Sequence, residues 1–333
     1  MELECAADPL SGLVAKVEDT VHRAWAKLVR ELGSPCHSPV TARDSGVRPL
    51  LLLLAAECGG GITARSSSLA SVVEFLYAAS VFHDEVSDDD AGGDRHPDEE
   101  AKWRSHASIL LGDYLLATAL SCLDADGNMA FLPDLMGVTA RMCKGQVGFL
   151  LARGSFLEIP DYLDLVEMKA GSLTAFCARA GLLTADGPPE WAEAFGAFGE
   201  RFGVAFHIAG EILDLDECSE PSAARRLYGA SRGFGLPLVL TAQAGQYERA
   251  ALATIAEKDE CSPEDLDLVR QLAETSGALS RCWEIADEWL SAALDPLASP
   301  PDTKAKQLLI ESAADLCRRQ QHPAVERLGS SPG

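Results

Sequence analysis

The chain has 333 residues, with 28 Lys and Arg against 51 Asp and Glu, a formal net charge of −23 and an isoelectric point near 4.6. This acidity excludes nucleic acid or an anionic membrane as the main partner, because phosphate contacts need Lys and Arg. A hydrophobic content of 47% and a mean hydropathy of +0.03 exclude a disordered chain. Only 6% of the residues are aromatic, so the apolar content is mostly Ala, Leu and Val, which is typical of helix interfaces.

The elements predicted in chain order are all helical, because apolar residues recur at a spacing of three or four through most of the chain. The predicted helices span residues 11–32, 49–57, 69–83, 105–123, 132–153, 159–183, 191–216, 236–256, 263–294 and 303–320. Gly and Pro clusters punctuate them, including Gly59-Gly60-Gly61, which we interpret as a turn between helices rather than a phosphate loop. The pattern predicts an all-α protein with one domain over residues 1–333 and loose ends at 1–10 and 322–333.

The N-terminus has acidic residues where a signal peptide needs a basic and then an apolar run. The longest apolar stretch, Pro49 to Cys58, is shorter than the roughly 20 residues of a membrane span. Ten cysteines are scattered without a CxxC pair, which favours reduced thiols and argues against a zinc site. We therefore expect a cytoplasmic protein without a membrane span.

An acidic segment follows the predicted helix 69–83. Nine of the seventeen residues from 84 to 100 are acidic. Most of them are explained by a solvated loop, but Asp84 and Asp88 continue the period of an apolar helix and lie four residues apart on one face. Because two such carboxylates repel each other, a divalent cation with a preference for oxygen ligands would stabilise them.

A second polar stripe lies in the predicted helix 191–216. His207, Glu211 and Asp214 fall at positions i, i+4 and i+7 among apolar neighbours. If the two acidic helix ends face each other across a bundle, they form a cage for Mg²⁺ and a polyanionic substrate. His207 is either a hydrogen-bonded interior histidine or a catalytic base.

Seven motifs then give the chain a family resemblance. In order, they are Gly46–Leu51 (the end of GKRxRP), Asp84–Asp88 (DDxxD), Leu111–Leu116 (LAGDxLL), Lys144–Gln146 (the GQ helix), Lys169–Leu173 (KTxxL), Phe206–Asp214 (FQxxDDxxD) and Gly235–Leu240 (the LPL helix). With these motifs the chain resembles the trans-isoprenyl diphosphate synthases, or polyprenyl synthetases, over roughly residues 40–320. The resemblance implies an all-α isoprenoid synthase bundle that uses Mg²⁺ to remove diphosphate from an allylic prenyl diphosphate.

The resemblance also implies the site residues. The implied metal ligands are Asp84, Glu85, Asp88, Glu211 and Asp214, with Asp84, Asp88 and Lys169 as catalytic residues. The implied diphosphate-binding residues are Arg48, Arg95, Gln146, Lys169, Arg225 and Arg226. Arg48 either binds phosphate or braces a helix. The implied chain pocket consists of Tyr77, Ala79, Ser80, His83, Phe206 and His207, and its small residues before the first acidic motif predict a substrate of twenty carbons or more.

The departures from the family pattern concern the acceptor diphosphate. The Lys and Arg of GKRxRP fall on Ser45 and Gly46, and the acceptor-binding His falls on Glu100. Acidic residues near a second diphosphate invert the electrostatics of that site. On the donor side, the leading Asp of the second motif is replaced by Gly210.

Three interpretations follow. The first is an enzyme that ionises an allylic diphosphate without elongating it, as class I terpene synthases do. The second is an ordinary elongating synthase whose acceptor cations come from other positions, such as Arg43, Arg95 or Lys102. The third is a regulatory subunit without activity of its own that binds an active synthase. We expect a homodimer, or a heterodimer with another synthase.

Overall fold

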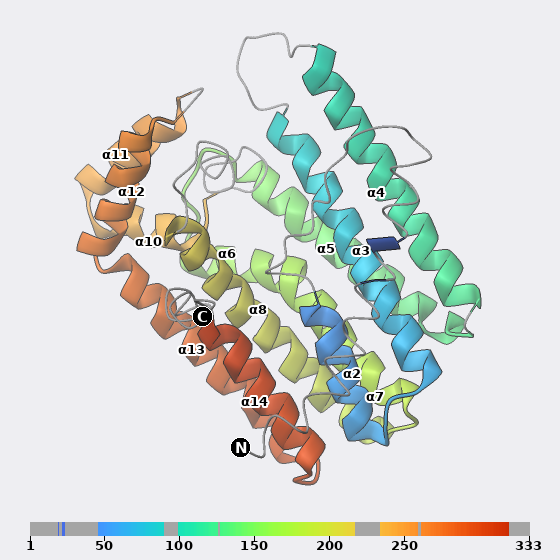
Figure 1. The fold of residues 1–333 in the computed structure, drawn as a ribbon. Helices are drawn as coiled ribbons and strands as arrows, with labels where there is room; N and C mark the ends of the chain where they lie inside the picture. The colour runs from blue at the N-terminus through green and yellow to red at the C-terminus, as the bar shows by residue number, and fades with distance from the viewer. Residues whose placement is uncertain are drawn as a thin grey trace, which may run out of the picture.

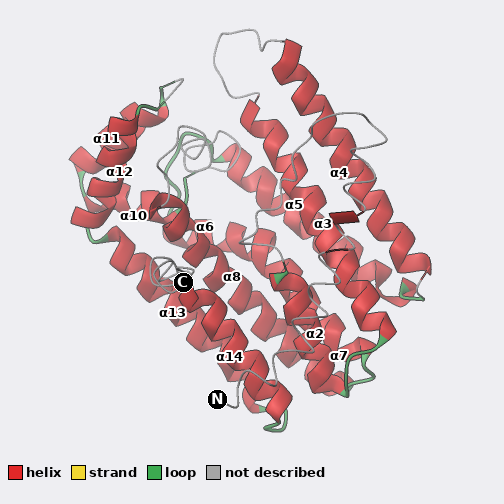
Figure 2. Cartoon of the chain, in the orientation of Figure 1, coloured by secondary structure: helices red, strands yellow, loops and turns green. Residues whose placement is uncertain are grey.

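The computed structural model describes residues 46–89, 99–125, 127–216, 234–258 and 261–319, together with residues 19, 22 and 23. For residues 85–89, 99–104, 216 and 319 it describes the backbone alone. Over these ranges the chain is helical and has no strand (Figure 2), which confirms the predicted all-α class. The predicted helix 11–32 and both predicted loose ends lie outside the described ranges, apart from three isolated positions in that helix.

The helices are labelled in Figure 1. The first five described are α2 (Val47–Gly59), α3 (Ala64–Asp89), α4 (Glu99–Ala125), α5 (Leu132–Leu151) and α6 (Ile159–Val166). A π-helical turn, η2 (Glu167–Gly171), joins α6 to α7 (Ser172–Thr184). The later ones are α8 (Ala192–Asp216), α10 (Leu236–Ala244), α11 (Gln246–Ala256), α12 (Pro263–Thr275), α13 (Ala278–Leu294) and α14 (Lys304–Arg319).

Glycines lie at three of the boundaries between helices. The predicted turn at Gly59–Gly61 is confirmed, and Gly60 and Gly61 have φ values of 143° and 121° that other residues rarely adopt. The single helix predicted over 236–256 is wrong, because an extended Gly245 separates α10 from α11. The single helix predicted over 263–294 is also wrong, since Gly277 turns the chain with a φ of 76°.

Helix α8 is central to the bundle, because it contributes to both of its hydrophobic clusters. One cluster joins α8 to α2, α3, α4 and α7, and the other joins it to α6, α10, α12 and α13. Along the first side of α8 the rings of Phe198, Phe202 and Phe206 follow one another, with centroids 6.1 and 5.8 Å apart. In Figure 1, α3 and α4 run side by side at one edge of the bundle, and α10 to α12 gather at the opposite edge.

Part of α4 is apolar but poorly covered. Its segment Ser105–Ala125 is long and apolar enough to cross a membrane by length and composition, and 28% of its most apolar window is buried. The side chains of Ile109, Leu110 and Tyr114 are 40%, 68% and 36% exposed. One such helix is weak support for a membrane span, and the same exposure suits an interface with another protein.

Helices α2 and α7 pack with their backbones in close approach. Gly181 of α7 lies against the carbonyl of Leu52, and a Cβ at this position would overlap that backbone oxygen. Since backbone cannot move aside as a flexible side chain can, the contact requires glycine. By contrast, Gly137 of α5 has no atom within 4 Å of the position that its Cβ would take.

We predict that Gly181→Ala lowers the free energy of unfolding by about 1–3 kcal/mol, because α2 and α7 must separate to admit the methyl group. The matched control Gly137→Ala should leave stability unchanged or raise it by up to about 1 kcal/mol, since alanine favours a helix more than glycine does. Thermal or denaturant unfolding followed by circular dichroism measures both. Equal stability of the two variants would contradict the close packing of α2 on α7.

Candidate active site

Three helical elements meet at Lys169. Its ammonium Nζ donates to Asp84 Oδ2 of α3 at 2.9 Å and to Gln146 Oε1 of α5. The side chains are largely enclosed, with exposed fractions of 21% for Lys169 and 10% for Asp84. Such a partly buried pair is stable only while both partners are present, because either charge alone would be left poorly solvated. The structure thus brings together three residues that the sequence predicted for one site.

The position of Lys169 depends on the π-helical turn η2. Residues Glu167–Gly171 interrupt what was predicted as one helix over 159–183. A π-helical turn inserts a residue into the helical repeat and rotates the side chains that follow, and such turns are frequent at functional sites. Gly145 of α5 lies against this turn, since its Cβ would come within 3.0 Å of the Lys169 backbone nitrogen. The close approach places the next residue, Gln146, within reach of the ammonium group.

Two further glycines allow α8 to approach the same turn closely. A Cβ on Gly203 would lie 3.0 Å from the Cα of Gly171, and a Cβ on Gly171 would lie 2.9 Å from the carbonyl oxygen of Glu200. Nearby, Arg141 of α5 donates to Glu200 at 3.0 Å and to Glu167 at 3.4 Å. Burial, followed by the neighbouring Glu200, raises the pKa of Glu167 above its ordinary value. The turn is therefore fixed by backbone contacts on two sides and by an ionic network on its surface.

Glu211 of α8 is held by groups from three elements. Its Oε2 accepts hydrogen bonds from the hydroxyl of Tyr162 in α6 at 2.6 Å and from the backbone N–H of Leu236, the first residue of α10, at 2.8 Å. Its Oε1 lies 3.3 Å from His207 Nε2, one turn earlier in α8. Of the two alternatives for His207, the structure favours the hydrogen-bonded interior histidine.

The pKa values of this group are shifted by its enclosure. Burial acts to raise the pKa of Glu211, but the interactions with His207, Tyr162 and Leu236 outweigh it and hold the pKa below its ordinary value. Tyr162 is fully buried, and both burial and the charge of Glu211 raise its pKa well above the usual 10. Glu211 therefore stays ionised and Tyr162 stays a donor near neutral pH.

His83, next to Asp84 in α3, faces α4. Its Nε2 lies 3.3 Å from Asp113 Oδ1, and its ring fills the space that a Cβ on Gly112 would take. The Gly112-Asp113 pair of the LAGDxLL motif thus gives His83 room and a carboxylate partner. The side chain of His83 is 41% exposed, and its place in a chain pocket stays a prediction.

Arg48 lies against an aromatic ring. Its guanidinium carbon is 3.2 Å from the ring centroid of Tyr77 in α3, in cation–π geometry. Arg48 and Glu74 are also close enough to the buried Cys177 to act on its pKa in opposite directions, while burial, the largest cause, raises that pKa to about 12. Of the two alternatives for Arg48, the contact with Tyr77 favours a brace between α2 and α3.

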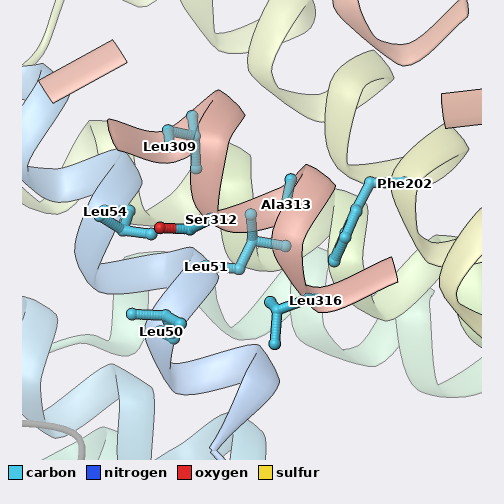
Figure 3. A pocket seen from close by; sticks show the side chains of 8 residues that line it. All are labelled: Leu50, Leu51, Leu54, Phe202, Leu309, Ser312, Ala313 and Leu316. Atoms are coloured by element: carbon cyan, nitrogen blue, oxygen red, sulfur yellow. The ribbon is translucent and has the colours of Figure 1, made fainter. Parts of the chain in front are cut away.

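The remaining residues of the predicted chain pocket lie on α3 and α8. Ala79 is buried, Ser80 donates to the carbonyl of Tyr77 at 2.7 Å, and Phe206 packs against the ring of Phe202 in a tilted geometry. A separate crevice opens between α2, α8 and α14, where Leu51, Phe202 and Leu309 are among the lining residues (Figure 3). Its cavity volume of about 10 Å³ holds at most one water, so this crevice is not a substrate site.

Several predicted site residues lie outside the part of the chain whose side chains the structure describes. Asp88 and Glu85 lie in α3 as backbone only, and Arg95, Arg225 and Arg226 fall outside the described ranges. Asp214 is half-buried near the end of α8. Among the residues that the structure describes, no group of three His, Cys, Asp or Glu side chains is close enough to hold a metal ion.

The fit of these residues to Mg²⁺ differs between the two acidic motifs. In the first motif, Asp84 keeps one carboxylate oxygen beyond its bond to Lys169, and Asp88 follows one helical turn later on the same face of α3. Carboxylate oxygens are the ligands that Mg²⁺ prefers, so the residue types at these two positions suit a divalent cation. In the second motif, both oxygens of Glu211 already have partners within the protein, which does not suit a metal ligand.

Sequence reasoning missed the contributions of Tyr162 and Asp113. Tyr162 lies in the amphipathic helix Ile159–Val166 at the spacing of its apolar residues, and a tyrosine on a buried face has a hydroxyl that must find a partner. Asp113 stood inside a recognised motif, but the sequence could not show that it faces His83 from the neighbouring helix.

Comparison with known proteins extends these observations. The sequence pattern of the polyprenyl synthetase family matches residues 15–272. Heptaprenyl diphosphate synthase component 2 of Geobacillus stearothermophilus is 27% identical over 324 residues, covering 96% of this chain and 99% of the relative. All-trans-nonaprenyl-diphosphate synthase (geranyl-diphosphate specific) of Rhodobacter capsulatus is 28% identical over 312 residues, covering 91% and 93%.

Solved structures agree on the fold. A polyprenyl synthase from Caulobacter crescentus CB15, complexed with calcium and isoprenyl diphosphate, superimposes with a TM-score of 0.78 at 24% identity, covering 95% of this chain and 96% of that one. A decaprenyl diphosphate synthase from Rhodobacter capsulatus gives a TM-score of 0.72 at 25% identity, covering 95% and 98%. Since the family pattern covers most of the sequence and the fold matches over nearly the whole chain, this protein belongs to the polyprenyl synthetase family, whose members are prenyltransferases.

Proposed function

We propose that the protein is a Mg²⁺-dependent trans-prenyl diphosphate synthase, which joins an allylic prenyl diphosphate of twenty carbons or more to isopentenyl diphosphate. The observation that carries this proposal is the convergence of Lys169, Asp84 and Gln146 from three helical elements. The printed names of the relatives, which are prenyl diphosphate synthases of several chain lengths, support the same activity.

Each residue of this group has a role in the proposed reaction. Lys169 binds oxygens of the allylic diphosphate and stabilises the negative charge that grows as the carbon–oxygen bond breaks. Gln146 orients the ammonium group. Asp84, Glu85, Asp88 and Asp214 are the proposed metal-binding residues, and Mg²⁺, when bound, neutralises the diphosphate and makes it a better leaving group. The apolar side chains around Ala79 and Phe206 keep water from the carbocation.

A second candidate function is ionisation without elongation, as in class I terpene synthases. The observation that favours it is at the start of α2, where the family's cations are replaced. There the N–H of Gly46 donates to the buried carboxylate of Glu74 at 3.3 Å, so this backbone faces an acidic group. An acidic environment disfavours a second diphosphate. The relatives support elongation more strongly than this alternative.

We also propose a protein partner that covers the exposed apolar faces of α4 and α5. Leu110 on α4 is 68% exposed, and Val147 and Leu151 on α5 are 51% and 83% exposed. A second copy of the chain is the first choice. A different synthase subunit is the alternative, since one relative is named as a component of its enzyme. A subunit without activity of its own, the third interpretation, would use the same faces.

We predict that the purified protein with Mg²⁺, geranylgeranyl diphosphate and radiolabelled isopentenyl diphosphate gives longer prenyl diphosphates. Thin-layer and gas chromatography of the products, with and without the acceptor, measure this outcome. A hydrocarbon or alcohol formed without the acceptor would overturn elongation in favour of the terpene synthase alternative. The lack of any product, together with co-purification of a second synthase, would support the regulatory subunit.

We predict that Asp84→Asn lowers kcat by about 10²-fold or more under either enzymatic function, because the variant loses a charge at the developing diphosphate and its metal ion. The control Asp124→Asn changes an exposed aspartate near the end of the neighbouring helix α4 and should retain full activity. Steady-state kinetics at saturating Mg²⁺ measures both. Wild-type turnover by Asp84→Asn would show that the metal assignment is wrong.

A further inference from the structure

Glu211 was implied as a metal ligand, but its contacts give it another role. Its Oε2 accepts two hydrogen bonds, from the hydroxyl of Tyr162 and from the backbone N–H of Leu236. Its Oε1 lies 3.3 Å from His207 Nε2. A carboxylate can accept more than three hydrogen bonds in open solution, but here the side chain is only 20% exposed. Little of its surface is left for an ion.

The two groups that donate hydrogen bonds to Glu211 Oε2 both depend on this oxygen as their acceptor. Tyr162 is fully buried, and its hydroxyl would lose its partner if an ion took this oxygen. The N–H of Leu236 belongs to the first turn of α10, where the backbone donors have no partner inside their own helix. A buried donor without an acceptor costs free energy, so a metal ion at Oε2 would have to compensate for both losses.

The surrounding backbone is shaped around this carboxylate. Gly235 is the N-cap of α10, and a Cβ at this position would lie 2.9–3.0 Å from the Glu211 carboxylate atoms. The partial positive charge at the N-terminus of α10 also stabilises an anion at this place. These contacts explain how Glu211 remains ionised in a largely enclosed site, where burial alone would raise its pKa.

We propose that Glu211 is a structural anchor that fastens α6 and α10 to α8 and does not ligate the metal ion. The proposal rests on the proposed function, since it concerns the metal of that same site. Asp214 is then the acidic residue of the second motif that remains a proposed metal ligand, because Gly210 has no side chain. In this proposal the second acidic motif serves partly in packing, through Glu211, and partly in metal binding, through Asp214.

The test uses the full-length protein with Mn²⁺ and inorganic diphosphate, so that no turnover is needed. Free Mn²⁺ is followed by electron paramagnetic resonance, and Tm by calorimetry. For Glu211→Gln we expect a Mn²⁺ dissociation constant within about threefold of wild type and a Tm lower by about 2–6 °C. Glu274→Gln removes the same charge from an exposed site on α12 and should change neither quantity.

Tyr162→Phe is the second variant, because it keeps the carboxylate and removes one donor. If Glu211 is an anchor, Tyr162→Phe lowers Tm by a similar amount, leaves Mn²⁺ binding unchanged, and couples to Glu211→Gln in a double-mutant cycle. If Glu211 is a ligand, freeing its oxygen should tighten Mn²⁺ binding. Should Glu211→Gln fail to fold, Tyr162→Phe alone decides between these outcomes.

A tenfold or greater weakening of Mn²⁺ binding in Glu211→Gln would overturn the proposal whatever its Tm. An unchanged Tm in both variants would also overturn it. Asp84→Asn, measured in parallel, reports separately on the proposed function. If Asp84→Asn binds Mn²⁺ as wild type does, the proposed metal site fails, while the anchor is still judged by the Tm values and by their coupling.

Discussion

The ammonium group of Lys169 joins α3, α5 and the π-helical turn at one point, and the geometry of the site depends on this contact. Asp84 and Gln146 are 62 residues apart in the chain and both accept a hydrogen bond from Lys169. The contact in turn requires the π-helical turn, because a regular helix would carry the lysine in another direction. It also requires Gly145, which lets α5 approach the backbone of the turn. The ionic contact at the site therefore depends on the backbone geometry of the π-helical turn and of α5.

Charge is distributed unequally between the two acidic motifs. At the first, Asp84 is paired with the ammonium group of Lys169, which lies at the end of a flexible side chain. At the second, Glu211 is engaged by fixed donors from the protein itself. The two motifs look alike in sequence, since each places acidic residues about one helical turn apart in an apolar helix, Asp84 and Asp88 in the first and Glu211 and Asp214 in the second. The two carboxylates differ in their partners, because Asp84 is bound by a flexible lysine side chain and Glu211 by a buried hydroxyl and a backbone N–H.

Much of the fold could be predicted from the sequence, because helical periodicity marks the apolar faces of α2, α3, α5 and α8 directly. The breaks at Gly245 and Gly277 were missed, since a single glycine inside a periodic stretch is tolerated in many helices. The π-helical turn was missed because no local composition distinguishes it from a regular helix. At the site, the motifs led to Lys169, Asp84 and Gln146. They could not reveal the contacts of Glu211, because its partners Tyr162 and Leu236 lie on other helices.

The glycine contacts around the π-helical turn have a consequence for motion. Where Gly171 and Gly203 meet, backbone lies on backbone, and there are no rotamers through which the contact could yield. The wall of the site that carries Lys169 therefore behaves as one stiff body with α8. Helix α4 packs on the rest of the described bundle mainly through α3, which itself packs on α2 and α7. We therefore expect any change in the shape of the site to displace α3 and α4 together against the stiff wall.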